Sequence, residues 1–265
     1  MTSISVASWN VNSIRARLDL LVTWLKENKP DIVLLQELKA LEEVVPKEEI
    51  EDLNYNLAIK GQKAYNGVAI LSKYPISDIN YSLPNLKNDV QSRYIEAWVD
   101  INGIGFRIAS VYAPNGNPIF SEKYDYKIRW LQAFKEYAIE LLQNEEPIIL
   151  GGDYNICPSK LDVANEELIF EDAIYQKEVK NIYREILNFG YVDAFRAFNN
   201  EKKDFTYWDY GQAFYNNIGV RIDHLLLSSL ATDRCKKVYI DRNPRGKKKP
   251  SDHTPIIATF SVNNK

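Results

Sequence analysis

Polar side chains of the types that bind phosphate or transfer protons stand at the ends of several short apolar runs. Four runs end in such residues, namely Asn10, Glu37, Tyr112, and the pair Asp153 and Asn155. Two later runs begin with them instead, at Asp223, Asp252 and His253. Apolar, β-branched runs of this length predict buried strands. If these strands share sheets, we expect the polar residues to gather at one rim.

The segment GGDYN places Asp153 and Asn155 directly after the apolar run PIIL. The two glycines allow a tight turn, and side chains i and i+2 of an extended chain point the same way. A carboxylate beside an amide can hold a water molecule or a phosphate oxygen. The alternative is an Asx-turn that only ends the strand.

The segment PSDHTP holds Asp252 and His253 between two prolines, which restrict the backbone of this short polar loop. Histidine is the usual proton carrier near neutral pH, and a neighbouring carboxylate fixes its tautomer. The alternative is a surface histidine without a role. The other histidine, His224, follows Asp223 at the start of HLLLS, and we expect a structural or peripheral place for it.

Glu37 ends the apolar run DIVLLQE, where an unpaired carboxylate would be costly to bury. A salt bridge to a lysine or arginine would satisfy it, and so would a metal ion. An oxygen-only ligand set, with no cysteine and at most one histidine nearby, selects Mg²⁺ or Mn²⁺ over zinc. Asn10 and Asn12 precede a predicted helix, so on their own they indicate N-cap residues.

Amphipathic helices lie between the predicted strands. Apolar residues spaced three and four apart predict helices over residues 15–28, 122–144 and 179–189. Further strands are predicted at 67–73, 94–101 and 238–242. The alternating pattern of 94–101 suits an antiparallel or mixed sheet with one buried face. This order favours two packed sheets with helices outside, and a three-layer α/β protein is the alternative.

The composition is that of a globular protein. A chain of 265 residues with 45% hydrophobic and 26% charged residues is not wholly disordered, collagen-like or coiled coil, and we expect one domain over residues 1–265. No apolar run approaches the ~18 residues of a membrane span, and the first residues do not resemble a signal peptide. We therefore expect a soluble protein that is not exported. The only cysteines, Cys157 and Cys235, make no disulfide framework, which fits a cytoplasmic location.

The net charge of −3 hides an uneven distribution. Residues 36–54 carry seven acids and two bases, whereas residues 201–265 carry twelve bases and seven acids. Five of those bases lie in the segment RNPRGKKK, residues 242–249. A chain that is acidic on average can still present one basic face to a polyanion. The alternative is a solvated hairpin loop.

Eight segments between residues 4 and 260 resemble, in order and near the same spacing, the exonuclease III type of abasic-site endonuclease. They are SWNVNSIRARL, DIVLLQELK, YNGVAILSKYPI, SVYAPNGN, GGDYNICP, FTYWDY, VRIDHLLLS and KPSDHTPI. The resemblance implies a four-layer α/β-sandwich, with two mixed β-sheets face to face and helices outside. It also implies a monomeric Mg²⁺-dependent hydrolase, with Mn²⁺ as a substitute ion. Its substrate would be double-stranded DNA, cut 5′ to abasic sites to leave a 3′-hydroxyl and trimmed at 3′ ends.

The resemblance also implies roles for individual residues around a metal ion. Glu37 would be the principal Mg²⁺ ligand, with Asn10 and Asp252 close to the metal. Asp153 would activate or position the attacking water. The protein would then act mainly by positioning groups for in-line attack at phosphorus.

Other residues would hold the scissile phosphate and the DNA around it. By the resemblance, Asn155 and Tyr112 hold the phosphate, and His253, oriented by Asp223, contacts a phosphate oxygen or moves a proton. Residues implied to contact the substrate are Asn12, Asn115, Trp208, Arg245, Lys247 and Lys248. Trp208 would stack beside a displaced sugar, and core packing is its alternative role.

The sequence departs from the family pattern at three places. Asn12 stands where some relatives have an acid that helps to bind metal, so the metal environment is expected to differ. His224 stands where an apolar residue or tyrosine is expected, and the loop at 242–249 is unusually basic. Such a loop predicts strong contact with the phosphate backbone and a marked salt dependence of binding.

Other activities of the superfamily remain as alternatives. They are a nonspecific DNase, an inositol-phosphate phosphatase, a sphingomyelin hydrolase and a nonenzymatic DNA-binding relative. The missing export signal argues against the secreted enzymes, and a basic loop near Trp208 suits a duplex better than a small head group. The complete set of carboxylates with His253 argues against a protein without enzymatic activity.

Overall fold

The computed structural model describes residues 3–86 and 88–262, and over these residues two six-stranded sheets form the centre of the molecule. The first sheet has the strand order β11 (Cys235–Ile240), β12 (Ile256–Ser261), β1 (Ser3–Asn10), β2 (Ile32–Gln36), β4 (Val68–Ser72), β3 (Asn56–Lys60). The second has the order β5 (Ile76–Asn80), β6 (Tyr94–Ile101), β7 (Ile104–Tyr112), β8 (Ile148–Asp153), β10 (Asp223–Leu227), β9 (Val192–Asp193). In each sheet one pair is parallel, β1 with β2 and β7 with β8, and the other pairs are antiparallel. Both sheets are therefore mixed, as predicted.

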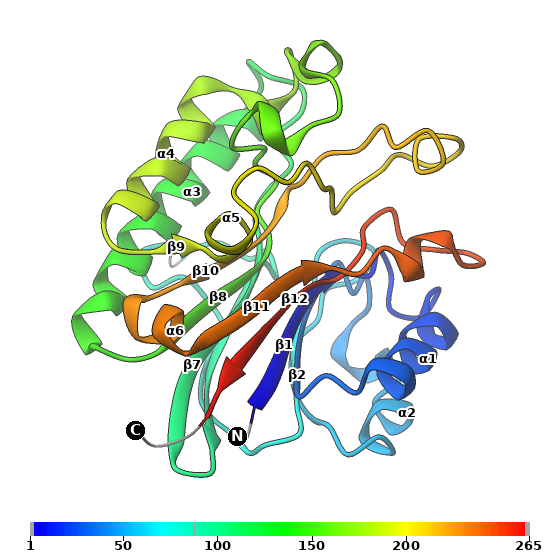
Figure 1. Cartoon of the computed structure of the whole chain (residues 1–265), viewed down its shortest axis with the longest axis vertical. Helices are drawn as coiled ribbons and strands as arrows, with labels where there is room; N and C mark the ends of the chain where they lie inside the picture. Colours follow the sequence, from blue (N-terminus) through cyan, green and yellow to red (C-terminus); the bar gives the residue numbers. More distant parts are fainter. Residues whose placement is uncertain (1–2, 87, 263–265) are drawn as a thin grey trace.

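Helices cover the outer faces of the two sheets (Figure 1). The α-helices are α1 (Leu18–Asn28), α2 (Glu48–Glu51), α3 (Glu122–Leu141), α4 (Lys177–Asn188), α5 (Ala194–Phe198) and α6 (Ser229–Arg234). Short 3₁₀ turns are η1 (Glu42–Val44), η2 (Leu142–Asn144), η3 (Lys160–Asp162), η4 (Glu166–Ile169), η5 (Ala173–Tyr175) and η6 (Asn243–Gly246). Helices α1 and α2 lie on one side and α3 and α4 on the other, which confirms the four-layer α/β-sandwich.

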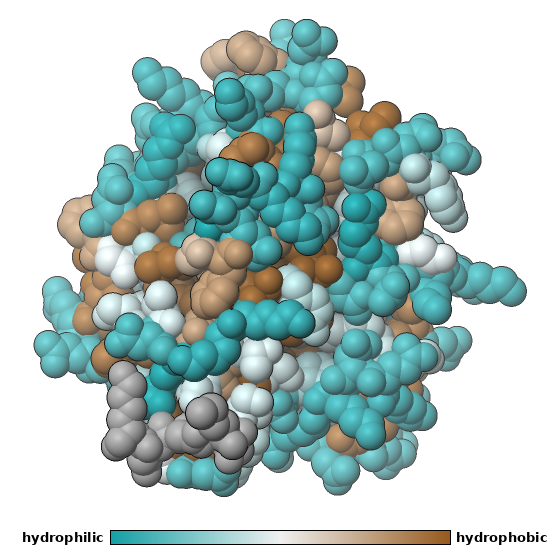
Figure 2. All heavy atoms as spheres, viewed as in Figure 1, coloured by the Kyte–Doolittle hydropathy of each residue, from teal (hydrophilic) through white to brown (hydrophobic). Residues whose placement is uncertain are grey.

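The core is divided into layers because side chains alternate between the two faces of each strand. Val6 of β1 and Leu34 of β2 point between the sheets and pack with Ile149 of β8. Their neighbours Ala7 and Val33 point outward, into the layer that α1 covers. The surface over α1 and α2, at lower right in Figure 2, is mainly hydrophilic, as amphipathic helices require.

The predicted elements agree with the structure apart from their ends. The helix predicted over 15–28 begins at Leu18, because residues 14–17 form a turn, and the helix predicted over 179–189 is Lys177–Asn188. The helix predicted over 122–144 is α3 continued by the 3₁₀ turn η2. The strand predicted at 238–242 is Cys235–Ile240. Within residues 3–86 and 88–262, none of the helices combines the length and the apolar character that crossing a bilayer requires.

Candidate active site

The strand ends bring the predicted polar residues together at one rim of the two sheets. Asp153, at the end of β8, is paired in register with Tyr112 of β7 on one side and Asp223 of β10 on the other. Asn10 ends β1 in the opposite sheet, and its side-chain nitrogen donates to Asp153 Oδ2 at 2.9 Å. The same nitrogen donates to Glu37 Oε1 at 3.1 Å. Asn10 therefore joins the two sheets at the site.

Asp153, His253 and Asp223 form a buried line of alternating charge. His253 donates from Nδ1 to Asp223 Oδ2 at 2.8 Å, and its Nε2 lies 3.7 Å from Asp153 Oδ2. Burial lowers the pKa of His253, but the carboxylates of Asp223 and Asp153 outweigh burial and raise that pKa above its usual value. Burial also raises the pKa of Asp153. A protonated imidazole therefore lies beside a carboxylate that is an unusually good base.

Glu37 is held by three partners although most of its side chain is buried. Tyr112 donates its hydroxyl to Glu37 Oε1 at 2.8 Å, Asn10 donates to the same oxygen, and Lys39 Nζ lies 2.7 Å from Oε2. Burial alone would raise the pKa of Glu37, but Lys39 and these hydrogen bonds lower it on balance. The carboxylate is therefore ionised, as a cation ligand must be.

Asn12 extends this oxygen-rich group to Asp252. Its Nδ2 donates to Asp252 Oδ1 at 3.0 Å, and its Oδ1 accepts from Lys39 Nζ at 2.6 Å. Carboxylate and amide oxygens are ligands that suit Mg²⁺. The Lys39 ammonium, which contacts Glu37 Oε2 and Asn12 Oδ1, shows that a positive charge fits between these oxygens. The donor set of Glu37, Asp252 and Asn12 thus fits a magnesium ion.

Asn10 differs from the expected oxygen ligand. Its Oδ1 accepts the backbone N–H of Asn12 at 3.0 Å, so its amide nitrogen is the atom that faces Glu37 and Asp153. It acts here as a hydrogen-bonding bridge between two carboxylates.

A second group of potential metal ligands consists of Asp153, Asp223 and His253, whose ligand atoms all lie within 4.8 Å of one another. The carboxylates of Asp223 and Asp153 raise the pKa of His253, so a metal ion bound there would have to displace the imidazole proton.

Asn155 and Asn115 lie on the loops that follow β8 and β7. Asn155, in the left-handed conformation (φ +49°), donates to Ala113 O at 2.9 Å, and Asn115 Nδ2 reaches Asn155 Oδ1 at 3.4 Å. Lys127 of α3, which is fully buried, donates to Pro114 O and Asn155 O and so ties the loops together. Burial lowers the pKa of Lys127 to about 7. A lysine within a helix gives no sign of burial, so the sequence does not predict this role of Lys127.

The structure corrects the expectation for Trp208. Its side chain is fully buried against Phe205 and Phe214, so it is not offered to a displaced sugar. Its neighbour Tyr207 is partly exposed, and the Tyr207 ring lies 5.0 Å from that of His253. The backbone bridges from Tyr207 to Val220 and His253 turn this side chain toward the site. Of these two adjacent aromatic residues, Tyr207 is therefore the one that lies beside His253.

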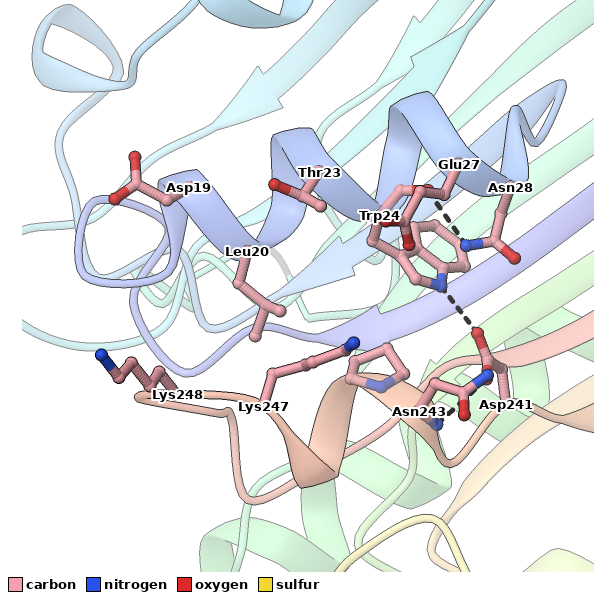
Figure 3. Close-up of a pocket in the computed structure, with 11 residues that line it drawn as sticks. Asp19, Leu20, Thr23, Trp24, Glu27, Asn28, Asp241, Asn243, Lys247 and Lys248 are labelled. Atoms are coloured by element: carbon pink, nitrogen blue, oxygen red, sulfur yellow. Dashed lines mark hydrogen bonds between the residues drawn. The ribbon is translucent and has the colours of Figure 1, made fainter.

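The basic loop is also only partly exposed. Arg245 is buried and donates to the backbone oxygens of Trp208 and Asp209, so it holds the neighbouring loop and does not face solvent. Lys247 and Lys248 are exposed and line a cavity of about 400 Å³ between α1 and η6 (Figure 3). Taken over the described residues, this cavity shares no lining side chain with the cluster around Glu37 and Asp153.

His224 is a buried structural residue, as expected. Its Nε2 donates to Ile156 O at 2.8 Å, while Nδ1 lies 2.8 Å from Arg221, a donor on its other side. Arg221 is fully buried and also bonded to Asp162 and Asp193. Burial and the charge of Arg221 lower the pKa of His224 to about 4. A neutral His224 thereby anchors the loop that carries Asn155.

A groove of about 700 Å³ opens beside Glu37 and Tyr112. It runs between the segment 62–66, the loop after β7 and the start of α3. Three cations line it, Lys39, Arg93 and Lys123. The Arg93 guanidinium lies 4.8 Å over the Tyr112 ring and donates to Tyr112 O. The groove is thus suited to an anionic chain that passes Glu37 and Tyr112.

Known proteins match this chain over nearly its whole length. Residues 7–253 match the Endonuclease/Exonuclease/phosphatase family. The chain is 33% identical to exodeoxyribonuclease III of Haemophilus influenzae over 262 residues, which cover 96% of this chain and 98% of that protein.

Two solved structures share the fold at similar sequence identity. A 3′ phosphatase from Neisseria, bound to a product DNA hairpin, has a TM-score of 0.93 and is 33% identical over 98% of this chain and all of the other (100%). An AP endonuclease from Archaeoglobus fulgidus has a TM-score of 0.92 and is 33% identical to this chain. The match covers 98% of this chain and 100% of the other.

Proposed function

The chain belongs to the endonuclease/exonuclease/phosphatase family, and we propose that it cuts DNA 5′ to abasic sites and leaves a 3′-hydroxyl. It is a hydrolase of the exonuclease III and AP endonuclease type. The proposed reaction depends on Mg²⁺, for which Mn²⁺ can substitute. The observation that carries the proposal is the line Asp223–His253–Asp153, which lies beside the ionised Glu37 at a rim formed by both sheets.

Asp153 is the proposed base for the attacking water. Its pKa is raised by burial, so it takes a proton more readily than an exposed aspartate. The Asn10 amide fixes the carboxylate from the opposite sheet. His253, kept protonated by Asp223, donates from Nε2 to an oxygen of the scissile phosphate.

Other groups at the rim neutralise and orient the phosphate. The Tyr112 hydroxyl, which donates to Glu37 in the DNA-free protein, can donate to a phosphate oxygen instead. Lys127 fixes the loop of Asn155 and Asn115 close to this hydroxyl. Mg²⁺, held by Glu37 and Asp252 with Asn12, would supply positive charge to the phosphate and the leaving oxygen. Asn12 is neutral, so this site has one negative charge fewer than a site with an acid there.

The groove beside Glu37 is the proposed path of the cut strand. Lys39, Arg93 and Lys123 would contact backbone phosphates, and exposed Lys247 and Lys248 would reach the duplex from the other side of the rim. The Neisseria relative, as similar as the AP endonuclease, is a 3′ phosphatase bound to product DNA, which supports trimming of 3′ ends as a second activity. Action as a cytoplasmic monomer is also proposed, and light scattering of the purified protein tests the monomer.

The test is cleavage of an end-labelled duplex with one tetrahydrofuran abasic analogue, in Mg²⁺ or in EDTA. This analogue cannot break by β-elimination, so a single Mg²⁺-dependent cut 5′ to it reports hydrolysis. We expect the cut with the wild type and its loss with Asp153→Asn. Tight binding of intact DNA would instead indicate a nonenzymatic DNA-binding protein. Intact DNA without binding would indicate a phosphatase for small substrates.

A further inference from the structure

Lys39 lies within the group of oxygens that fits a metal ion. Its Nζ is 2.7 Å from Glu37 Oε2 and 2.6 Å from Asn12 Oδ1. The side chain is 30% exposed, so the ammonium is partly removed from water. Lys39 is one of the cations proposed to line the path of the cut strand, but the proposed reaction gives its ammonium no role among these oxygens. The ammonium therefore occupies a place whose chemistry suits a cation of higher charge.

The backbone holds Lys39 in this place. Glu37 and Lys39 both adopt the left-handed conformation, with φ of +53° and +51°. Non-glycine residues rarely adopt it without support from their surroundings. The support here is the pair of backbone bonds from Lys39 N to Asn66 O and from Leu38 N to Gly67 O. The turn brings two side chains that are two residues apart to one point, so their ion pair is built into the fold.

We propose that Lys39 is the resident counter-ion of the metal site, where it stabilises the metal-free protein and weakens the binding of a divalent cation. The inference rests on the metal site of the proposed function. The charge of Lys39 cancels that of Glu37 and Asn12 adds none, so the metal-free group carries only the single negative charge of Asp252. A divalent cation that binds Glu37 must do so against the repulsion of this ammonium. Lys39 thus sets the affinity for the metal.

The test is a titration of the DNA-free protein with Mn²⁺, with free Mn²⁺ followed by electron paramagnetic resonance. Lys39→Met keeps the aliphatic bulk and removes the charge, and we expect it to bind Mn²⁺ about tenfold more tightly than the wild type. Lys73→Met is the matched control, because Lys73 is also 30% exposed and pairs with a carboxylate, Asp31, and a backbone oxygen. It should leave the affinity unchanged. Glu37→Gln should lose most of the binding.

Thermal unfolding gives a second measurement that does not depend on activity. In EDTA, Lys39→Met should unfold at a lower temperature than the wild type, because Glu37 has lost its counter-ion. In saturating Mn²⁺ the order should reverse, because tighter binding stabilises the folded state more.

The outcomes separate this inference from the proposed function. Equal or weaker Mn²⁺ binding by Lys39→Met would overturn the role of Lys39 while Glu37→Gln still identified the metal site. Mn²⁺ binding that does not respond to Glu37→Gln would overturn the metal site itself, and the role of Lys39 with it.

Discussion

The amide of Asn10 bonds to Asp153 across the junction of the two sheets, at 2.9 Å. Asn10 ends β1 and Asp153 ends β8, so one hydrogen bond fixes the ends of the two sheets relative to each other. The same amide nitrogen reaches Glu37. The proposed base and the proposed metal ligand are therefore positioned by one neutral side chain.

Asn10→Ala should reduce the rate of incision by about a hundredfold, because Asp153 and Glu37 both lose the donor that orients them. The free energy of unfolding should fall by about 1–3 kcal/mol, because buried acceptors lose their partner. Single-turnover cleavage and urea denaturation measure the two effects. Asn28→Ala, which removes an amide from the exposed end of α1, is the control and should change neither. An Asn10 variant with the wild-type rate would contradict the positioning role.

Asp223→Asn should lower the pKa of His253, because one of the two carboxylates that raise it becomes neutral. We expect the single-turnover rate of incision to fall by about a hundredfold as His253 loses its proton and its fixed orientation. Nitrogen NMR of labelled histidine in the metal-free protein follows the titration of His253. The buried His224 serves as the internal reference. An unchanged titration of His253 would show that Asp223 does not control it.

Arg245→Ala and Lys248→Ala should separate stability from DNA contact. Arg245→Ala leaves the backbone oxygens of Trp208 and Asp209 without their donor, so the free energy of unfolding should fall by about 2–3 kcal/mol. Lys248→Ala removes an exposed charge and should leave stability unchanged. It should reduce the slope of log affinity for DNA against log salt concentration by about 1. An unchanged slope would mean that Lys248 does not contact phosphate.

His224 should make the protein sensitive to acid. Burial and Arg221 lower the pKa of His224 to about 4, whereas an unfolded histidine titrates near its ordinary value of about 6.5. Between these values the unfolded chain binds the extra proton, so stability is present above pH 6.5 and is lost as the pH falls toward 4. The loss from this residue is about 3 kcal/mol.

His224→Gln tests this dependence, because glutamine can keep both hydrogen bonds but does not titrate. Urea denaturation at pH 4.5 and pH 7 should show a smaller difference in unfolding free energy for the variant than for the wild type. The same difference in both proteins would assign the acid sensitivity to other groups.

Much of the site could be predicted because it lies at strand ends. Apolar runs locate β1, β7 and β8, and the residues that end them, Asn10, Tyr112 and Asp153, meet at one rim for that reason. The short strands β3, β5 and β9 were not predicted. They lie at the sheet edges, and β5 is largely exposed, so its sequence lacks an apolar run.

Loop residues were harder to place because their direction depends on distant contacts. Tyr207 and Trp208 are adjacent aromatic residues, and only the bridges to Val220 and His253 decide which one faces the site. Arg245 stands in a basic run typical of an exposed loop, yet the η6 turn directs it inward. The irregular backbone around Lys39 likewise has no sequence pattern that predicts it.

The pairing of β1 with β12 has a consequence for synthesis on the ribosome. Asn10 and Glu37 are made first, but the strand beside β1 and the residues Asp252 and His253 come more than two hundred positions later. A nascent chain therefore lacks the His253 imidazole and the Asp252 carboxylate until these late positions have left the ribosome. Truncated translation products that stop before His253 would release no active nuclease into the cell.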